Sequence, residues 1–208
     1  MRWLSRMTHP FILLTLRRLH WATSARAGAL MVREDAEPSE PHVCVLLDDR
    51  VGSYDPDTGP DSGTGGQPAQ FEEAVELAAA LCRVTAEAGH PLRFATCSGR
   101  YTLTVPGSST RTPTREAGEL EWLLAEIAVT HVADAPHGLV NLDVAVAVTG
   151  PRAELSTLAT DLRDAQTGVV AVVDPRPLVS AGSDAGLLVI RGASSTALAQ
   201  QWGLAVGR

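Results

Sequence analysis

The sequence contains no lysine: all 17 of its basic residues are arginine, and 24 acidic residues outnumber them. Six arginines and no acidic residue lie in residues 1–33, so this segment carries +6 and the remainder −13, which gives the net −7. Phosphate recognition requires a cationic surface, so the acidic remainder disfavours nucleic-acid binding. The basic N-terminal segment is instead suited to contact with a membrane surface or an acidic partner.

Cysteine is also scarce. Three residues, an odd number, disfavour a secreted disulfide framework. Cys44, Cys82 and Cys97 each lie in an apolar pattern and are predicted to be reduced, packed side chains, because free cysteine behaves as a small hydrophobe. The sequence has no zinc spacing of Cys and His, no glycine-rich nucleotide motif and no GxSxG. Its apolar run at Phe11–Leu16 is far shorter than the roughly 20 residues that cross a bilayer.

One segment organises the remaining chain. Residues 42–49 read HVCVLLDD, an apolar, β-favouring run that is too short for a typical helix and ends in two carboxylates. It predicts a strand buried on both faces. A loop rich in Gly, Pro, Asp and Ser follows at Val51–Gln70, and we expect disorder at Asp57–Gly66. Ligands of open α/β sheets sit beyond the carboxyl ends of strands, so Asp48 and Asp49 point at the natural site.

Strand and helix patterns then alternate to the end of the sequence. We predict four helices, at Phe71–Glu87, Arg115–Val129, Ala153–Gln166 and Ser195–Leu204, the last capped by Ser195. Further strands are predicted at Pro91–Ser98, Tyr101–Val105, Asn141–Thr149, Val169–Asp174 and Gly186–Arg191. This alternation indicates one three-layer α/β domain with an open, largely parallel, Rossmann-like sheet over residues 41–208, behind a basic arm over residues 1–40.

A segment ahead of this domain carries a more specific motif. Residues 17–35 read RRLHWATSARAGALMVRED and resemble the signature segment of the domain of unknown function 58 family, in which Arg-x-Ile/Leu-His-Trp precedes Ser/Thr-Ala-Arg and Leu-x-Val-Arg-Glu. The residues that fit are Arg18, His20, Trp21, Ser24, Ala25, Arg26, Leu30, Val32, Arg33 and Glu34. The resemblance continues more loosely to Arg208. The Tyr-x-Pro-Gly-Asp element expected before Arg17 is missing, so our hypothesis is an N-terminally truncated or misdefined member, which sequencing of the upstream region would test.

The resemblance implies a fold, a partner and a location. Members of the family carry a von Willebrand factor A-like domain, typically behind two membrane-spanning helices, and are often encoded beside MoxR-type AAA ATPases. No established catalytic activity goes with the family. We therefore expect a protein partner such as a MoxR-type AAA ATPase. The chain as it stands is expected in the cytoplasm, or at the cytoplasmic face of the membrane if the family's helices exist upstream.

Two interpretations of the signature segment stay open. In the first, Trp21 and Leu30 pack against the sheet while Arg18, Arg26 and Arg33 pair with acidic groups of the domain, which makes the segment a structural clasp. In the second, the segment is an arginine-rich surface for a partner protein or a lipid headgroup. The residues concerned are Arg18, His20, Trp21, Ser24, Arg26, Arg33 and Glu34.

The loop after the first strand departs from the pattern that the resemblance implies. The von Willebrand factor A fold commonly binds a divalent metal through Asp-x-Ser-x-Ser at this point, because hard cations require several oxygen ligands. Here the loop reads Asp48-Asp49-Arg50-Val51-Gly52, with Arg50 and Gly52 at the two serine positions. An arginine would oppose a cation directly. We therefore predict a degenerate metal-site loop without metal or cofactor, in which Asp48 accepts hydrogen bonds from loop amides or from Arg50.

These observations favour a non-enzymatic protein-interaction module that works with a MoxR-type AAA ATPase in a membrane-linked assembly or chaperone-like system. Two alternatives remain. The first is a metal-dependent hydrolase-type enzyme on a Rossmann-like sheet that uses Asp48 and Asp49, and the second is an inactive fragment. Cys97 follows the second predicted strand, where nucleophiles do occur, but no base can be assigned to it.

Overall fold

A computed structural model describes residues 42–56, 67–107, 115–132, 142–176, 180–184 and 187–206, all of which belong to the compact unit Glu40–Arg208. The basic arm predicted over residues 1–40, its signature segment, and the loop 57–66 for which disorder is expected lie outside the described residues.

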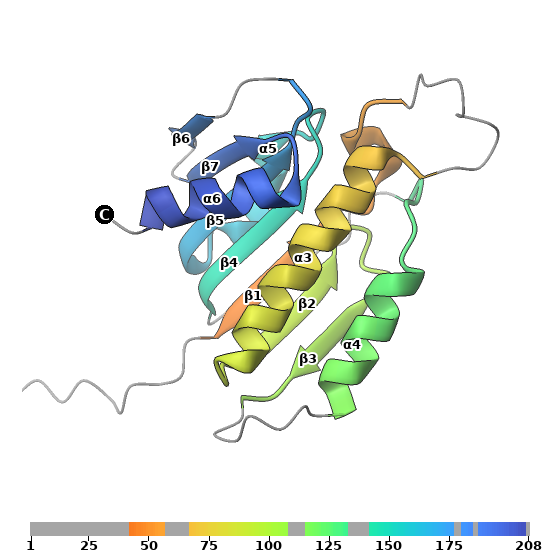
Figure 1. The fold of residues 1–208 in the computed structure, drawn as a ribbon, viewed down its shortest axis with the longest axis vertical. Helices are drawn as coiled ribbons and strands as arrows, with labels where there is room; N and C mark the ends of the chain where they lie inside the picture. The colour runs from red at the N-terminus through yellow and green to blue at the C-terminus, as the bar shows by residue number, and fades with distance from the viewer. Residues whose placement is uncertain are drawn as a thin grey trace, which may run out of the picture. The chain divides into compact units, whose positions relative to one another are not determined.

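The described residues form a seven-stranded sheet in the order β3-β2-β1-β4-β5-β7-β6 (Figure 1). The five inner strands run parallel to one another: β2 (Leu92–Thr96), β1 (Val43–Leu47), β4 (Leu142–Thr149), β5 (Ala165–Val173) and β7 (Leu187–Gly192). At the two edges, β3 (Thr102–Val105) and β6 (Ser180–Asp184) pair antiparallel with their neighbours. The prediction of an α/β fold with an open, largely parallel sheet is therefore confirmed.

Helices cover both faces of this sheet, which gives the three predicted layers. On one face, α3 (Ala69–Glu87), α4 (Arg115–Glu126) and α6 (Ser195–Val206) contribute side chains to the larger of two buried apolar clusters. On the other face, α5 (Leu155–Leu162) contributes Leu158 and Leu162 to the second cluster. Among the helices that the structure describes, none combines the length and the apolar content that crossing a bilayer would require.

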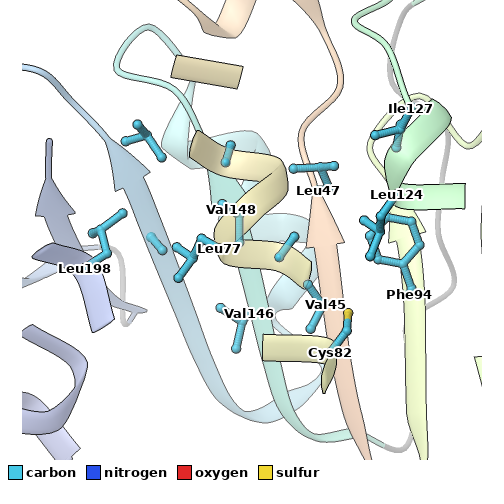
Figure 2. Packing of buried hydrophobic residues seen from close by; sticks show 14 of the residues in the cluster. Val45, Leu47, Leu77, Cys82, Phe94, Leu124, Ile127, Val146, Val148 and Leu198 are labelled. Atoms are coloured by element: carbon cyan, nitrogen blue, oxygen red, sulfur yellow. The ribbon is translucent and has the colours of Figure 1, made fainter. Parts of the chain in front are cut away.

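Strand β1 is an inner strand of the sheet, between β2 and β4, and is buried on both faces as its sequence predicts. Its side chains alternate between the two clusters: Val45 and Leu47 pack on the α3 face, and Cys44 and Leu46 on the opposite face. All four are fully buried. Figure 2 shows Val45 and Leu47 beneath α3, between side chains of the neighbouring strands β2 and β4. An uninterrupted apolar run is what a parallel strand covered on both faces requires.

The structure differs from the local predictions at one helix–strand boundary, at one strand that was not predicted and at one helix cap. The helix expected to reach Gln166 ends at Leu162, and β5 begins at Ala165, four residues before the predicted strand start, because residues 165–167 pair with the first half of β4. Strand β6 has the sequence SAGSD, which carries no β-favouring pattern; its pairing with β7 overrides local propensity. The helix cap is Ser194, whose hydroxyl accepts a hydrogen bond from an amide of α6, and not Ser195.

Candidate functional site

The sheet register brings polar side chains from three strands to one place. Leu47, the last residue of β1, lies beside Thr96 of β2 and Val148 of β4. The next residue, Asp48, continues the pairing, since its amide donates to the Val148 carbonyl at 2.8 Å. Ser98 and Thr149 therefore flank the two carboxylates that follow β1, at the carboxyl edge where open α/β sheets hold ligands.

Asp48 is fully buried, and donors from its own domain engage both of its carboxylate oxygens. Arg50 donates from Nε to Oδ1 at 2.7 Å, from Nη2 to Oδ2 at 2.9 Å and from its amide to Oδ1 at 3.2 Å. The Thr149 hydroxyl donates to Oδ2 at 2.7 Å. The forked guanidinium contact has the geometry of the strongest charged hydrogen bonds. It agrees with the structural role that the sequence predicts for Asp48.

Asp49 is also fully buried and holds the turn after β2. The Ser98 amide donates to Oδ1 at 2.9 Å and the Ser98 hydroxyl donates to Oδ2 at 2.5 Å. The same hydroxyl oxygen accepts the Arg100 amide at 3.2 Å. Asp49 thus ties the β1 loop to the β2 loop, and Thr130 fixes the other side of the β1 loop by donating its amide to the Asp49 carbonyl at 2.7 Å.

Tyr54 anchors the loop behind the two carboxylates. Its hydroxyl donates to the Asp48 carbonyl at 2.5 Å, and its ring makes an edge contact with Phe71 of α3, with centroids 5.4 Å apart. Burial raises the pKa of Tyr54 well above its usual value, and the Asp48 carboxylate adds to the shift. The hydroxyl therefore remains a proton donor at neutral pH. Opposite it, Gly150 leaves no room for a Cβ, which would lie 2.3 Å from the Ser53 carbonyl oxygen.

A second Asp-x-Arg turn follows β5. Arg176 donates to Asp174 Oδ1 from Nε at 2.8 Å and from its amide at 3.1 Å, the same pair of bonds that Arg50 makes to Asp48. Arg191 lies 3.9 Å from the other Asp174 oxygen. The hydrogen bond from Arg176 holds the pKa of Asp174 below its usual value. The same Asp-x-Arg turn therefore follows two strands, β1 and β5, at this edge of the sheet.

The side chains of the β1 loop do not fit the divalent metal that a von Willebrand factor A-like site would hold. A cation at Asp48 would have to displace the Arg50 guanidinium, which already supplies positive charge to both carboxylate oxygens. Residue 52 is glycine and offers no side-chain ligand. Within the described ranges, no group of three or more His, Cys, Asp or Glu side chains is placed to hold a metal ion.

The three cysteines are free and buried, which confirms the prediction that they are packed thiols. Burial raises the pKa of Cys44 and of Cys82 to about 12, so both are protonated thiols at neutral pH. Cys97 is fully buried beside the candidate site.

The structure describes only some of the predicted site residues. Asp48, Asp49 and Arg50 lie together at the sheet edge, whereas Arg18, His20, Trp21, Ser24, Arg26, Arg33 and Glu34 lie outside the described residues. Sequence reasoning missed Ser98, Thr149 and the Asp174–Arg176 pair. The sequence did contain a signal for these residues, because Ser98, Thr149 and Asp174 each end a predicted strand. The pattern Asp-x-Arg also occurs at the ends of two predicted strands, the first and the one that ends at Asp174.

Comparison of the chain with family models, with curated proteins and with solved structures finds no match.

Proposed function

We propose that this chain is a non-enzymatic protein-interaction module with a von Willebrand factor A-like fold. One observation carries the proposal: the chain's own donors hold both carboxylates at the natural ligand-binding edge. Arg50 and Thr149 engage Asp48, and Ser98 engages Asp49. Side chains committed in this way stabilise loops, and a sheet edge with stable loops is suited to present a contact surface.

The fold is compatible with the proposal. An open, largely parallel sheet with helices on both faces is the architecture expected of a von Willebrand factor A-like domain. The resemblance of residues 17–35 to the domain of unknown function 58 signature supplies the partner class, a MoxR-type AAA ATPase. It also supplies the setting, an assembly or chaperone-like system at the cytoplasmic face of a membrane.

The alternative of a metal-dependent hydrolase would use Asp48 and Asp49 as metal ligands or as an acid and a base. That chemistry needs at least one carboxylate oxygen directed at a substrate, metal or water. The forked contact from Arg50 occupies both oxygens of Asp48, and Ser98 donates to both oxygens of Asp49. The interaction module is therefore the better supported of the two.

A binding experiment separates these functions. The purified chain is mixed with a MoxR-type AAA ATPase from the same organism, and complex formation is measured by size-exclusion chromatography and by calorimetry. An unrelated AAA ATPase serves as the control. We expect a complex with the MoxR-type ATPase only, unchanged by a chelator. Hydrolysis of ester or phosphoester substrates that requires an added divalent cation, together with no complex, would overturn the proposal.

A further inference from the structure

Four neighbouring strand ends carry an arginine each. The strands β2, β1, β4 and β5 are adjacent in the sheet, run parallel and so end at the same edge. An arginine follows the last residue of each by three or four positions. We call these four residues the arginine row; in sheet order they are Arg100, Arg50, Arg152 and Arg176.

The row stands out in an acidic chain. The described residues contain nine arginines, and the four of the row, together with Arg191 beside Asp174, lie at this one edge, although the chain beyond residue 33 carries −13. Arg100 and Arg152 are exposed and take part in no ion pair with any residue that the structure describes. The Arg176 side chain is 61% exposed, and that of Arg50 is 18% exposed.

The acidic groups of the same edge lie mostly underneath. Among the described residues of the loops that follow these four strands, Asp48, Asp49 and Asp174 are buried, Asp55 is half-buried and Glu154 is exposed. On the described part of these loops, the charge that faces solvent is therefore mainly that of the arginines. Among the exposed guanidinium groups, that of Arg176 is fixed by a buried carboxylate, Asp174.

Two members of the row are held in place by the repeated turn. In both Arg50 and Arg176, the amide and Nε donate to one oxygen of the aspartate two residues earlier. Between them, the Arg152 amide donates to the Ser53 carbonyl at 3.0 Å, which ties the β4 loop to the β1 loop. A side chain that is already held in place, such as that of Arg176, loses less conformational entropy on binding than a mobile one.

The spacing of the row indicates the shape of its ligand. Adjacent strands lie about 4.8 Å apart, so four strand ends span about 14 Å, the length of roughly four residues of extended chain. A single phosphate group is bound by donors that converge on a point, whereas these arginines are spread along a line. A short acidic peptide in extended conformation matches both the sign of the charge and the linear arrangement.

We infer that the exposed members of the arginine row, Arg100, Arg152 and Arg176, bind an extended acidic segment of the partner protein. The inference rests on the proposed function, since it names the part of a partner that the interaction module would recognise. Charge would direct the acidic segment to the row, because the net acidic remainder of the chain repels that segment elsewhere.

The test uses a fluorescein-labelled peptide, Glu-Ser-Glu-Ser-Glu-Ser-Glu, and fluorescence anisotropy at low and at physiological salt. A peptide with glutamine at every glutamate position controls for non-specific binding. The exposed members of the row are replaced together, as Arg100→Gln, Arg152→Gln and Arg176→Gln. Arg50 is left in place because it supports Asp48. The matched control replaces three exposed arginines elsewhere, as Arg83→Gln, Arg115→Gln and Arg163→Gln.

We expect the row variant to bind the acidic peptide roughly tenfold or more weakly than the unmodified chain. The control variant should stay within about twofold, and binding should weaken as salt rises. Circular dichroism and urea unfolding verify that both variants fold. An equal loss of affinity for the acidic peptide in the row variant and the control variant would overturn the inference. So would a failure of the unmodified chain to bind the acidic peptide. Tripolyphosphate that competes at lower concentration than the peptide would overturn it too, in favour of a phosphate ligand.

Failure of the inference and failure of the proposed function give different results. If the ATPase complex forms and the row variant retains it unchanged, only the inference fails. If no ATPase complex forms and cation-dependent hydrolysis is found, the proposed function fails, whatever the result of the peptide-binding assay.

Discussion

Replacing Arg50 with alanine tests whether its guanidinium offsets the free-energy cost of burying the Asp48 carboxylate. Removal of one partner from a buried ion pair costs about 3–5 kcal/mol of folding stability. The Arg50 side chain is 18% exposed, and Thr149 and the residue-50 amide would still donate to Asp48. We therefore expect the lower end, about 3 kcal/mol. At roughly 3 °C per kcal/mol for a domain of this size, Tm should fall by about 9 °C.

Urea unfolding followed by circular dichroism measures this loss directly. Arg163→Ala, which removes an arginine whose side chain is 70% exposed, is the matched control and should change stability by no more than about 0.5 kcal/mol. The variants Asp48→Asn and Asp48→Asn/Arg50→Ala complete a double-mutant cycle. Because the two side chains touch, we expect a coupling of about 2 kcal/mol. A loss below about 1 kcal/mol for Arg50→Ala, or additive effects in the cycle, would refute the reasoning.

Three further predictions follow from the same geometry. Arg50→Ser with Gly52→Ser should create a site for Ca²⁺ or Mg²⁺ that calorimetry detects and the unmodified chain lacks, since a Cβ at residue 52 meets no atom within 4 Å. Gly150→Ala should destabilise the fold by about 1–3 kcal/mol in urea unfolding, with Gly52→Ala as the near-neutral control. Burial raises the pKa of Cys44 and Cys82 from 9.0 to about 12, so iodoacetamide at pH 8 should modify neither in the folded chain and both in urea. Their protonated thiols contribute stability that is present below pH 9 and is lost as pH rises toward 12.

Hydrophobic periodicity made the architecture predictable. The run Val43–Leu47 contains only apolar residues, and a strand buried on both faces requires that pattern. The prediction was weakest where tertiary pairing decides the conformation. Strand β6 at Ser180–Asp184 consists of small and polar residues, so nothing local marks it as a strand. The boundary near Ala165 failed for the same reason, since pairing with β4 recruits residues that a helical pattern also accommodates.

The candidate site was predictable in position but not in its bonds. Two carboxylates at the end of the first strand mark the edge, and Arg50 stands where the metal-site pattern has serine. Sequence spacing cannot show that Thr149 and Ser98 reach those carboxylates, because each bond crosses 101 or 49 residues of chain and depends on strand order. Once β1 is known to lie between β2 and β4, both contacts follow from the register.

A guanidinium and a divalent cation can both neutralise a buried aspartate at a strand end, but they leave the edge with different recognition chemistry. A bound cation keeps a coordination position for an oxygen of a partner, so the partner's attachment depends on the metal. Arg50 is covalently part of the chain and offers no such position, and its forked contact points inward at Asp48. If the edge binds a partner as proposed, the exposed cationic groups that the described loops offer it are the guanidinium groups of Arg100, Arg152 and Arg176. Such a surface attracts carboxylates through charge and guanidinium hydrogen bonds and without a metal, which makes binding sensitive to salt and indifferent to chelators.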